Sequence, residues 1–167
     1  MWRPARPPAP ARPLRARILG TADTARCTLP TLRSPLGTYQ DATGQTQCMW
    51  CPAGQGTGSV GAATCYPCPL GSYSSGPLEN CQLAVAGYYV ATSGGTTQAP
   101  CPSGTFSAAS GAASCDPCPA GHYAYGSGNT VCTACSAGTY STGKASLCRA
   151  CPAGTYSKAG ASTCIPW

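Results

Sequence analysis

The feature that most constrains this chain is a repeat of 16 or 17 residues that occupies residues 34–167. Eight copies begin at residues 34, 51, 68, 84, 101, 118, 135 and 151. A Gly stands three residues after every start, and an aromatic residue stands five residues after seven of the eight starts, with Gly56 as the exception. Units of this length cannot bury a core alone and become stable only by stacking on their neighbours. The sequence therefore predicts a tandem array.

Each unit is predicted to form a small hairpin. Pro at the second position fixes φ and starts an extended or turn segment. The recurring Gly indicates a backbone site with positive φ or a close approach of another segment. A first strand is expected to follow this Gly, a turn at the Gly that stands eight to ten residues after the start, and a second strand that ends at the closing Cys. The aromatic residue is expected to pack on the neighbouring disulfide and Gly, and a ligand-binding aromatic ladder is the alternative.

Hydrophobic burial cannot hold such an array together. Leu, Ile, Val and Phe together number only 16 of the 167 residues, whereas Cys alone numbers 14. We therefore predict a small disulfide-rich fold, with short β-hairpins in tandem forming an elongated rod with little hydrophobic core. One histidine, His122, and four acidic residues leave little acid–base chemistry, so we expect no enzyme, no catalytic residue and no cofactor. We also expect no membrane span within the chain, because its apolar runs are too short.

One irregular copy indicates how the cysteines pair. Repeat 84–98 has Ala84 and Gln98 where other copies have their opening and closing Cys, while Cys81 and Cys101 remain on either side. The absence of both cysteines from one copy leaves no unpaired cysteine elsewhere only if the opening and closing Cys of each repeat bond to each other. The expected pairs are Cys51–Cys65, Cys68–Cys81, Cys101–Cys115, Cys118–Cys132, Cys135–Cys148 and Cys151–Cys164. Because Ser34 stands where the first repeat would open, Cys27 is the candidate partner of Cys48.

Zinc binding is the alternative to disulfides. Cys48, Cys51, Cys65 and Cys68 have nearly the spacing of a four-thiolate zinc site, and so do Cys115, Cys118, Cys132 and Cys135. The array as a whole argues against this alternative. Cys81 and Cys101 would be single ligands, and Cys148, Cys151 and Cys164 would be an incomplete trio. We therefore expect no metal at the cysteines and retain a zinc-binding C-x-x-C module as the alternative.

The net charge of +6 lies entirely in residues 1–33, which hold seven Arg and one acid, whereas residues 34–167 are neutral. Pro and Arg interrupt the apolar residues of this segment throughout, so it does not have the pattern of a secretory signal peptide. We predict that residues 1–33 are a disordered, basic, Pro/Arg-rich leader. An arm that binds nucleic acid, glycosaminoglycan or lipid headgroups is the alternative. We expect no nucleic-acid partner.

The array resembles a known family. The phrase C-P-A-G-T-Y-S…G-A-S-T-C at 151–164, chained by C-x-x-C links, resembles the ephrin-receptor-like cysteine-rich repeat and is broadly similar to the cysteine-rich modules of tumour-necrosis-factor receptors. The resemblance covers about residues 34–167 and implies no catalytic residues. It implies an extracellular or cell-surface structural or adhesive rod or spacer, with extracellular protein or glycan as possible partners. The alternative is a fragment of a receptor ectodomain that binds such a ligand. Trp167, in place of the next expected Cys, suggests a fragment of a longer array.

Overall fold

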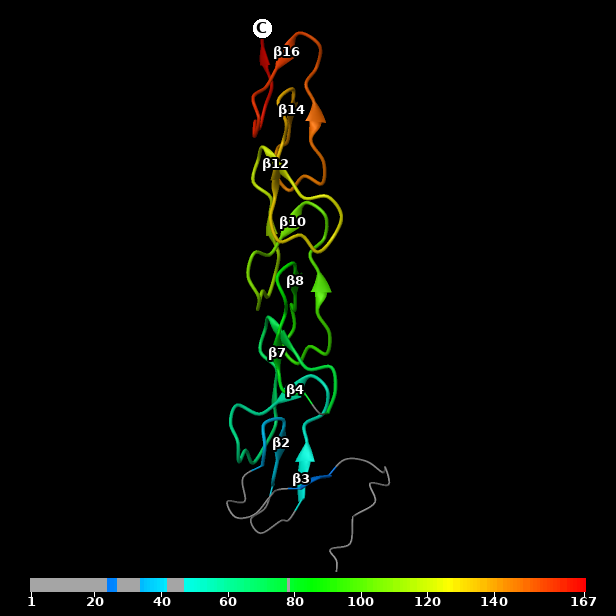
Figure 1. Ribbon diagram of the computed structural model, residues 1–167, viewed down its shortest axis with the longest axis vertical. Helices are drawn as coiled ribbons and strands as arrows, with labels where there is room; N and C mark the ends of the chain where they lie inside the picture. Colours follow the sequence, from blue (N-terminus) through cyan, green and yellow to red (C-terminus); the bar gives the residue numbers. More distant parts are fainter. Residues whose placement is uncertain (1–23, 27–33, 42–46, 78) are drawn as a thin grey trace, which may run out of the picture.

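The computed structural model describes residues 24–26, 34–41, 47–77 and 79–167. These residues form one elongated column of stacked hairpins, with strands β2 (Thr38–Tyr39) and β3 (Gln47–Trp50) near one end and the C-terminus at the other (Figure 1). Every regular element in this described part of the chain is a β-strand, and none is a helix. The expected fold, tandem hairpins with disulfides and little core, is confirmed.

Each hairpin pairs two very short antiparallel strands. After β2, the first strands are β4 (Gln55–Gly56), β6 (Ser72–Tyr73), β8 (Tyr88–Tyr89), β10 (Thr105–Phe106), β12 (His122–Tyr123), β14 (Thr139–Tyr140) and β16 (Thr155–Tyr156). After β3, the second strands are β5 (Tyr66–Pro67), β7 (Gln82–Leu83), β9 (Ala99–Pro100), β11 (Asp116–Pro117), β13 (Thr133–Ala134), β15 (Arg149–Ala150) and β17 (Ile165–Pro166). Each first strand pairs with the second strand that follows it along the chain.

The second strand does not lie where the sequence analysis placed it. It was expected to end at the closing Cys, but from β5 onward it occupies the two residues after that Cys, or after Gln98 in the repeat that lacks it. In the hairpin of β10 and β11, Thr105 lies opposite Pro117 and Phe106 opposite Asp116. The ladder then continues into a bond from the Cys118 N–H to the Gly104 carbonyl, 2.9 Å. The link between two repeats is therefore part of the hairpin, and the closing Cys stays outside the ladder.

A further strand, β1 (Thr24–Arg26), pairs antiparallel with β3, with Ala25 opposite Cys48. The order β1-β3-β2 makes this the three-stranded sheet among the described residues. β1 lies inside residues 1–33, the segment expected to be a disordered leader, and it pairs there because β3, which is four residues long, presents a second edge to another strand. The division into a leader at 1–33 and an array at 34–167 stays a prediction. Residues 1–23 and 27–33 lie outside the described part.

The recurring Gly sits in a tight turn that opens each hairpin. In the repeat that starts at Cys101, the Thr105 N–H donates to the Pro102 carbonyl at 3.1 Å, and Gly104 has φ of 79°. A positive φ at the third residue of a four-residue turn but not at the second, Ser103, is typical of type II, which favours Gly at the third residue. The Thr105 hydroxyl donates to the same Pro102 carbonyl at 2.7 Å. The predicted backbone role of this Gly is thus confirmed.

Backbone hydrogen bonds join each repeat to the next. The Gly104 N–H donates to the Ala124 carbonyl at 2.8 Å, and in return the Gly128 N–H donates to the Cys101 carbonyl at 2.8 Å. The same pair of bonds recurs one repeat later, from Gly121 to Ser141 and from Lys144 to Cys118. Because these bonds use main-chain groups, the stacking tolerates the variable side chains of the loops.

The turn glycines also contact the repeat after the next one. A methyl group added at Gly121 would overlap the carbonyl oxygen of Gly160 and lie 2.7 Å from its carbonyl carbon. Equivalent overlaps join Gly54 to Gly94, Gly71 to Gly111, Gly87 to Gly128 and Gly104 to Lys144. Each repeat therefore packs against two successive neighbours. The absence of a side chain at this position permits that approach.

The interior of the column is small and contains few apolar side chains. In the described part, the buried apolar residues are Ala84, Val90 and Ala124 together with the cysteines at positions 48, 51, 68, 101, 118 and 135. The other buried side chains belong to Ser and Thr, whose hydroxyls donate to backbone carbonyls except at Thr57, where Oγ1 accepts from the Gly37 N–H. For example, the Ser141 hydroxyl donates to His122 O and the Ser157 hydroxyl to Thr139 O, both at 2.8 Å. The expected shortage of hydrophobic core is confirmed.

Candidate functional site: the disulfide-closed repeats

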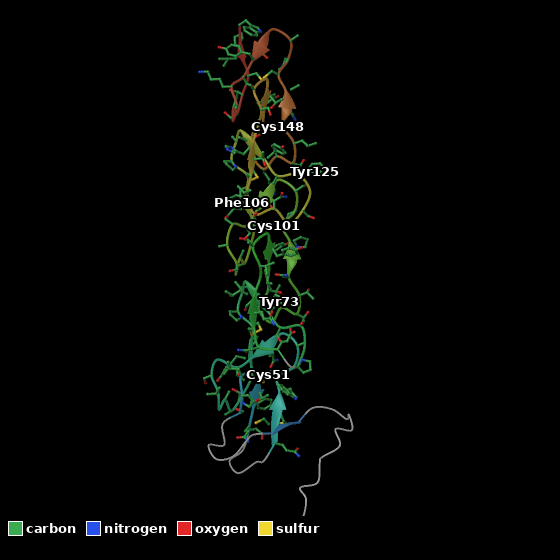
Figure 2. The ribbon with its side chains drawn as sticks, viewed as in Figure 1. Cys51, Tyr73, Cys101, Phe106, Tyr125 and Cys148 are labelled. Atoms are coloured by element: carbon green, nitrogen blue, oxygen red, sulfur yellow. A yellow bond between two sulfur atoms is a disulfide. The ribbon has the colours of Figure 1, made fainter. Side chains whose placement is uncertain are left out.

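Among the described residues, six disulfides have both of their cysteines in one repeat, and they follow one another along the column (Figure 2). The Cα–Cα distances lie between 5.5 Å and 5.8 Å, within the usual range for a disulfide. The opening Cys is buried in five of these repeats and half-buried at Cys151, whereas each closing Cys is half-buried. The bonds join the pairs that the repeat scheme expects: Cys51–Cys65, Cys68–Cys81, Cys101–Cys115, Cys118–Cys132, Cys135–Cys148 and Cys151–Cys164.

The two remaining cysteines belong to the first repeat. Cys48 is fully buried and disulfide-bonded. Cys27 lies outside the described residues, so the Cys27–Cys48 pair stays a prediction.

Repeat 84–98 replaces its disulfide with a hydrogen bond. The Val85 N–H donates to Oε1 of Gln98 at 2.8 Å, and this bond is exposed to solvent. Ala84, in the place of the opening Cys, is fully buried, and Val90 is 4% exposed. The two substitutions thus act together, because the small Ala fills the buried position while the Gln side chain reaches back to the start of the loop.

The cysteine quartets of the zinc alternative are divided between different disulfides. Within the first quartet, Cys51 is bonded to Cys65, whereas Cys68 is bonded to Cys81 outside it. Zinc is bound by cysteine thiolates, and the sulfur atoms of these bonds have no thiolate to offer. Over the described ranges, no group of three or more His, Cys, Asp or Glu side chains is arranged to hold a metal ion.

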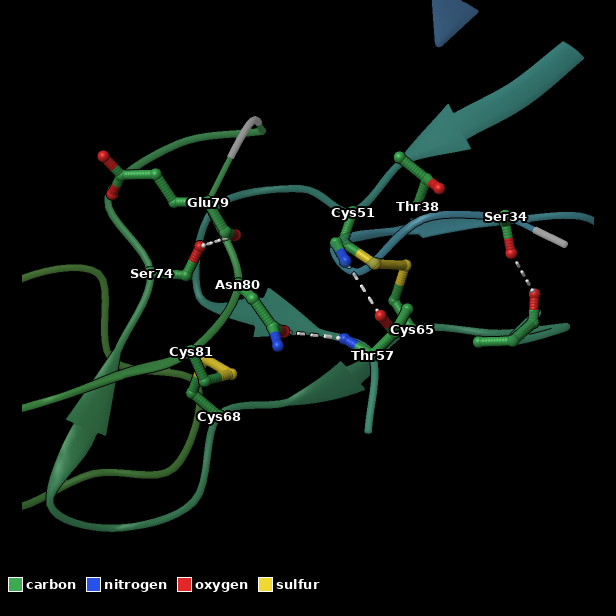
Figure 3. The surroundings of a disulfide bond; sticks show 12 residues. Ser34, Thr38, Cys51, Thr57, Cys65, Cys68, Ser74, Glu79, Asn80 and Cys81 are labelled. Carbon is green, nitrogen blue, oxygen red and sulfur yellow. Dashed lines mark hydrogen bonds between the residues drawn. A yellow bond between two sulfur atoms is a disulfide. The ribbon is translucent and has the colours of Figure 1, made fainter. Parts of the chain in front are cut away.

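The missing aromatic residue of the second repeat has a structural cause that the sequence analysis did not find. A Cβ at Gly56 would lie 2.9 Å from the Cys81 sulfur and would overlap Oδ1 of Asn80. That Oδ1 accepts a hydrogen bond at 3.0 Å from the N–H of the buried Thr57 (Figure 3). Asn80 therefore occupies the space that a side chain at position 56 would need. The signal in the sequence is only the coincidence of Gly56 with an Asn one residue before a closing Cys.

The aromatic residues at the fifth position after each start are half-buried, and their backbones take part in the stacking. Tyr73 forms a parallel bridge with Gly95, and Tyr123 forms one with Ala145, each in the following repeat. At the C-terminal end, the Tyr156 and Trp167 rings lie 4.8 Å apart. Packing of these rings on the disulfides stays a prediction. Their partial burial favours a structural role over an open ligand-binding ladder.

Other side chains offer little for chemistry. His122 lies on β12, half-buried, with Nδ1 3.4 Å from the Ala120 carbonyl. Several large apolar side chains are exposed along the column, including Tyr66, Leu83, Tyr125 and Val131, each at more than 60%. The part of the chain that the structure describes holds no helix long and apolar enough to cross a membrane.

Comparison with known proteins agrees with this geometry. The model of a family described as tyrosine-protein kinase ephrin type A/B receptor-like matches residues 24–64 and 104–146, together half of the chain. The first match begins at Thr24, the first residue of β1. No curated protein matches the chain.

Proposed function

Because the chain belongs to the tyrosine-protein kinase ephrin type A/B receptor-like family, whose match falls on its cysteine-rich repeats, we propose that it is a non-enzymatic extracellular or cell-surface rod with a structural or adhesive role. The observation that carries this proposal is the closure of successive repeats by their own disulfides within one elongated column. Such a column sets a distance between its two ends without any large core.

The disulfides support an extracellular location. Structural disulfides form and persist in oxidising compartments and are rare in the reducing cytosol. With so few buried apolar side chains, the column depends on these bonds for its stability. A reducing compartment would therefore remove its main source of stability.

The side chains support a role without catalysis. The 167 residues include a single histidine and four acidic residues. His122 lies on a hairpin strand whose partner residue in β13 is Ala134, so it faces no second titratable group in that pair. The resemblance to receptor ectodomain modules points in the same direction.

A receptor ectodomain that binds an extracellular protein or glycan is the second candidate. The observation that favours it is the exposure of large apolar and aromatic side chains, with Tyr125 at 72% and Val131 at 67% in one repeat. Tyrosine is enriched at protein interfaces because it combines an apolar ring with a hydroxyl. We propose extracellular protein or glycan as the partner class for both candidates.

Antibodies raised against the oxidised chain test the location. We expect them to label intact, non-permeabilised source cells or their medium, and we expect the chain taken from there to resist thiol-directed maleimide until it is reduced. Labelling that appears only after permeabilisation, together with cysteines that react without reductant, would contradict the proposal. The same chain after reduction and alkylation serves as the positive control for maleimide reactivity.

A further inference from the structure

Repeat 84–98 differs from its neighbours in covalent connectivity. Between Cys51 and Cys164 the disulfides enclose almost every loop, and the links between enclosed loops are two residues long. The exception is the segment from Gln82 to Pro100, which lies between bonded Cys81 and bonded Cys101 and which we call the open stretch. A backbone cut inside an enclosed loop leaves the two parts joined through its disulfide. A cut in the open stretch leaves no covalent bond across it.

The interaction that holds the two sides of the open stretch together is weaker than the disulfide that closes each other loop. The ends of the stretch are joined by the exposed Val85–Gln98 hydrogen bond, whereas each enclosed loop of similar length has a disulfide. The hydrogen bond breaks and re-forms with local motion, while the disulfide does not. Local opening of a segment is what exposes an extended backbone to a protease. A two-residue link held between two bonded cysteines cannot open in this way.

The open stretch contains large apolar and aromatic side chains of the kind that some endopeptidases recognise. Leu83 is 62% exposed, and Val85 is 49% exposed. Tyr88 and Tyr89 follow on β8, both half-buried. Val90 ties this repeat to both neighbours, since its carbonyl accepts from Gly71 N at 2.9 Å and its N–H donates to Ala112 O at 3.0 Å. Opening the repeat therefore loosens the column on both sides of it.

We propose that the open stretch is a proteolytic release site, at which an endopeptidase with a preference for large apolar residues divides the array in two. The reaction is hydrolysis of one peptide bond. Water supplies a hydroxyl to the carbonyl carbon and a proton to the new amine, with no redox change. The two products are separate disulfide-closed arrays, one on each side of the cut. An extracellular endopeptidase as the natural agent rests on the function proposed above, whereas the cleavage of the purified chain does not.

Chymotrypsin digestion of the oxidised full chain tests this proposal. On a non-reducing gel we expect two fragments, and mass spectrometry should place the cut after Leu83, Tyr88 or Tyr89. Tyr125 is an internal control, because it is 72% exposed (labelled in Figure 2) but lies inside the Cys118–Cys132 loop. A cut there should release fragments only after reduction. A native chain that stays one band without reductant, or that separates first at any other position between Cys51 and Cys164, would overturn the proposal.

The double variant A84C/Q98C adds the missing disulfide, and A84S/Q98S is the matched control without a new bond. In the first variant, a loss of two hydrogens by mass reports that the bond has formed. We then expect cleavage in the open stretch to slow by about 100-fold, from the usual effect of a disulfide on the open population, and any cut products to remain linked until reduced. The serine variant, which also lacks the Val85–Gln98 hydrogen bond, should cleave at least as fast as the native chain does. If the new bond forms and the fragments still separate without reductant, the proposal fails. If the bond does not form, the mapping on the native chain decides.

Discussion

Reducing the disulfides should convert the column into an expanded coil. On a chain-entropy estimate each bond that closes a loop of this size contributes about 3 kcal/mol. The six bonds together therefore exceed the net stability of a typical domain, about 5–15 kcal/mol. No large core remains to replace them, because the buried side chains of the described residues are mostly Cys, Ser and Thr.

Small-angle X-ray scattering before and after reduction measures this change. The oxidised chain should scatter as an elongated, folded particle. After reduction and alkylation it should scatter as a flexible coil, with a radius of gyration on the order of 40 Å for a chain of this length. Reoxidation of an unalkylated sample is the control and should restore the original profile. A compact particle that reductant leaves unchanged would contradict the dependence on disulfides.

Replacing a turn Gly with Ala should have the second largest effect, and its size should depend on the neighbours. In Gly121→Ala the positive φ of 84° costs about 1–2 kcal/mol for a residue with a Cβ. The new methyl also overlaps the Gly160 carbonyl, and overpacking of this kind costs about 1–3 kcal/mol more. The two contributions together should destabilise the column by about 2–5 kcal/mol.

Gly138→Ala is the matched control. Gly138 has nearly the same φ, 78°, but no atom lies within 4 Å of the position that its Cβ would occupy. The Gly138→Ala variant should therefore lose only the free energy of unfolding that the unfavourable positive φ costs, about 1–2 kcal/mol. Urea unfolding followed by tyrosine fluorescence, with the disulfides intact, measures both variants. Equal losses in the two variants would show that the close approach between Gly121 and Gly160 contributes nothing.

Residue spacing alone predicted the parts of this structure that lie within one repeat. The absence of both cysteines from repeat 84–98, where Ala84 and Gln98 stand instead, indicated that opening and closing cysteines bond to each other, and the recurring Gly indicated a positive φ. Both features depend on residues less than one repeat apart. Each repeated copy presents them again, so the pattern stands out from the variable loop residues.

The features that sequence reasoning missed depend on how one repeat is rotated on the next. A close approach at the recurring Gly was one of the two expected explanations, but its partner was not predicted: Gly121 contacts Gly160, two repeats away, and the period alone does not fix that rotation. The place of the second strand follows from the bond between Cys118 and Gly104, which pulls the link into the hairpin. Asn80 and Gly56 compensate each other across neighbouring repeats. Because this pair of residues occurs in only one place, the repeat pattern does not reveal it.

Peptide mapping of the unreduced chain tests most directly the central claim, that each of the six repeats with an opening and a closing Cys closes its own disulfide. After digestion of the oxidised protein under acidic conditions that prevent disulfide exchange, mass spectrometry should find Cys51 peptides linked to Cys65 peptides and Cys101 peptides linked to Cys115 peptides. The remaining described pairs should follow the same rule, one bond per repeat. A Cys51 peptide linked to a Cys68 or Cys81 peptide would contradict it, because the bonds would then join neighbouring repeats instead of closing each one.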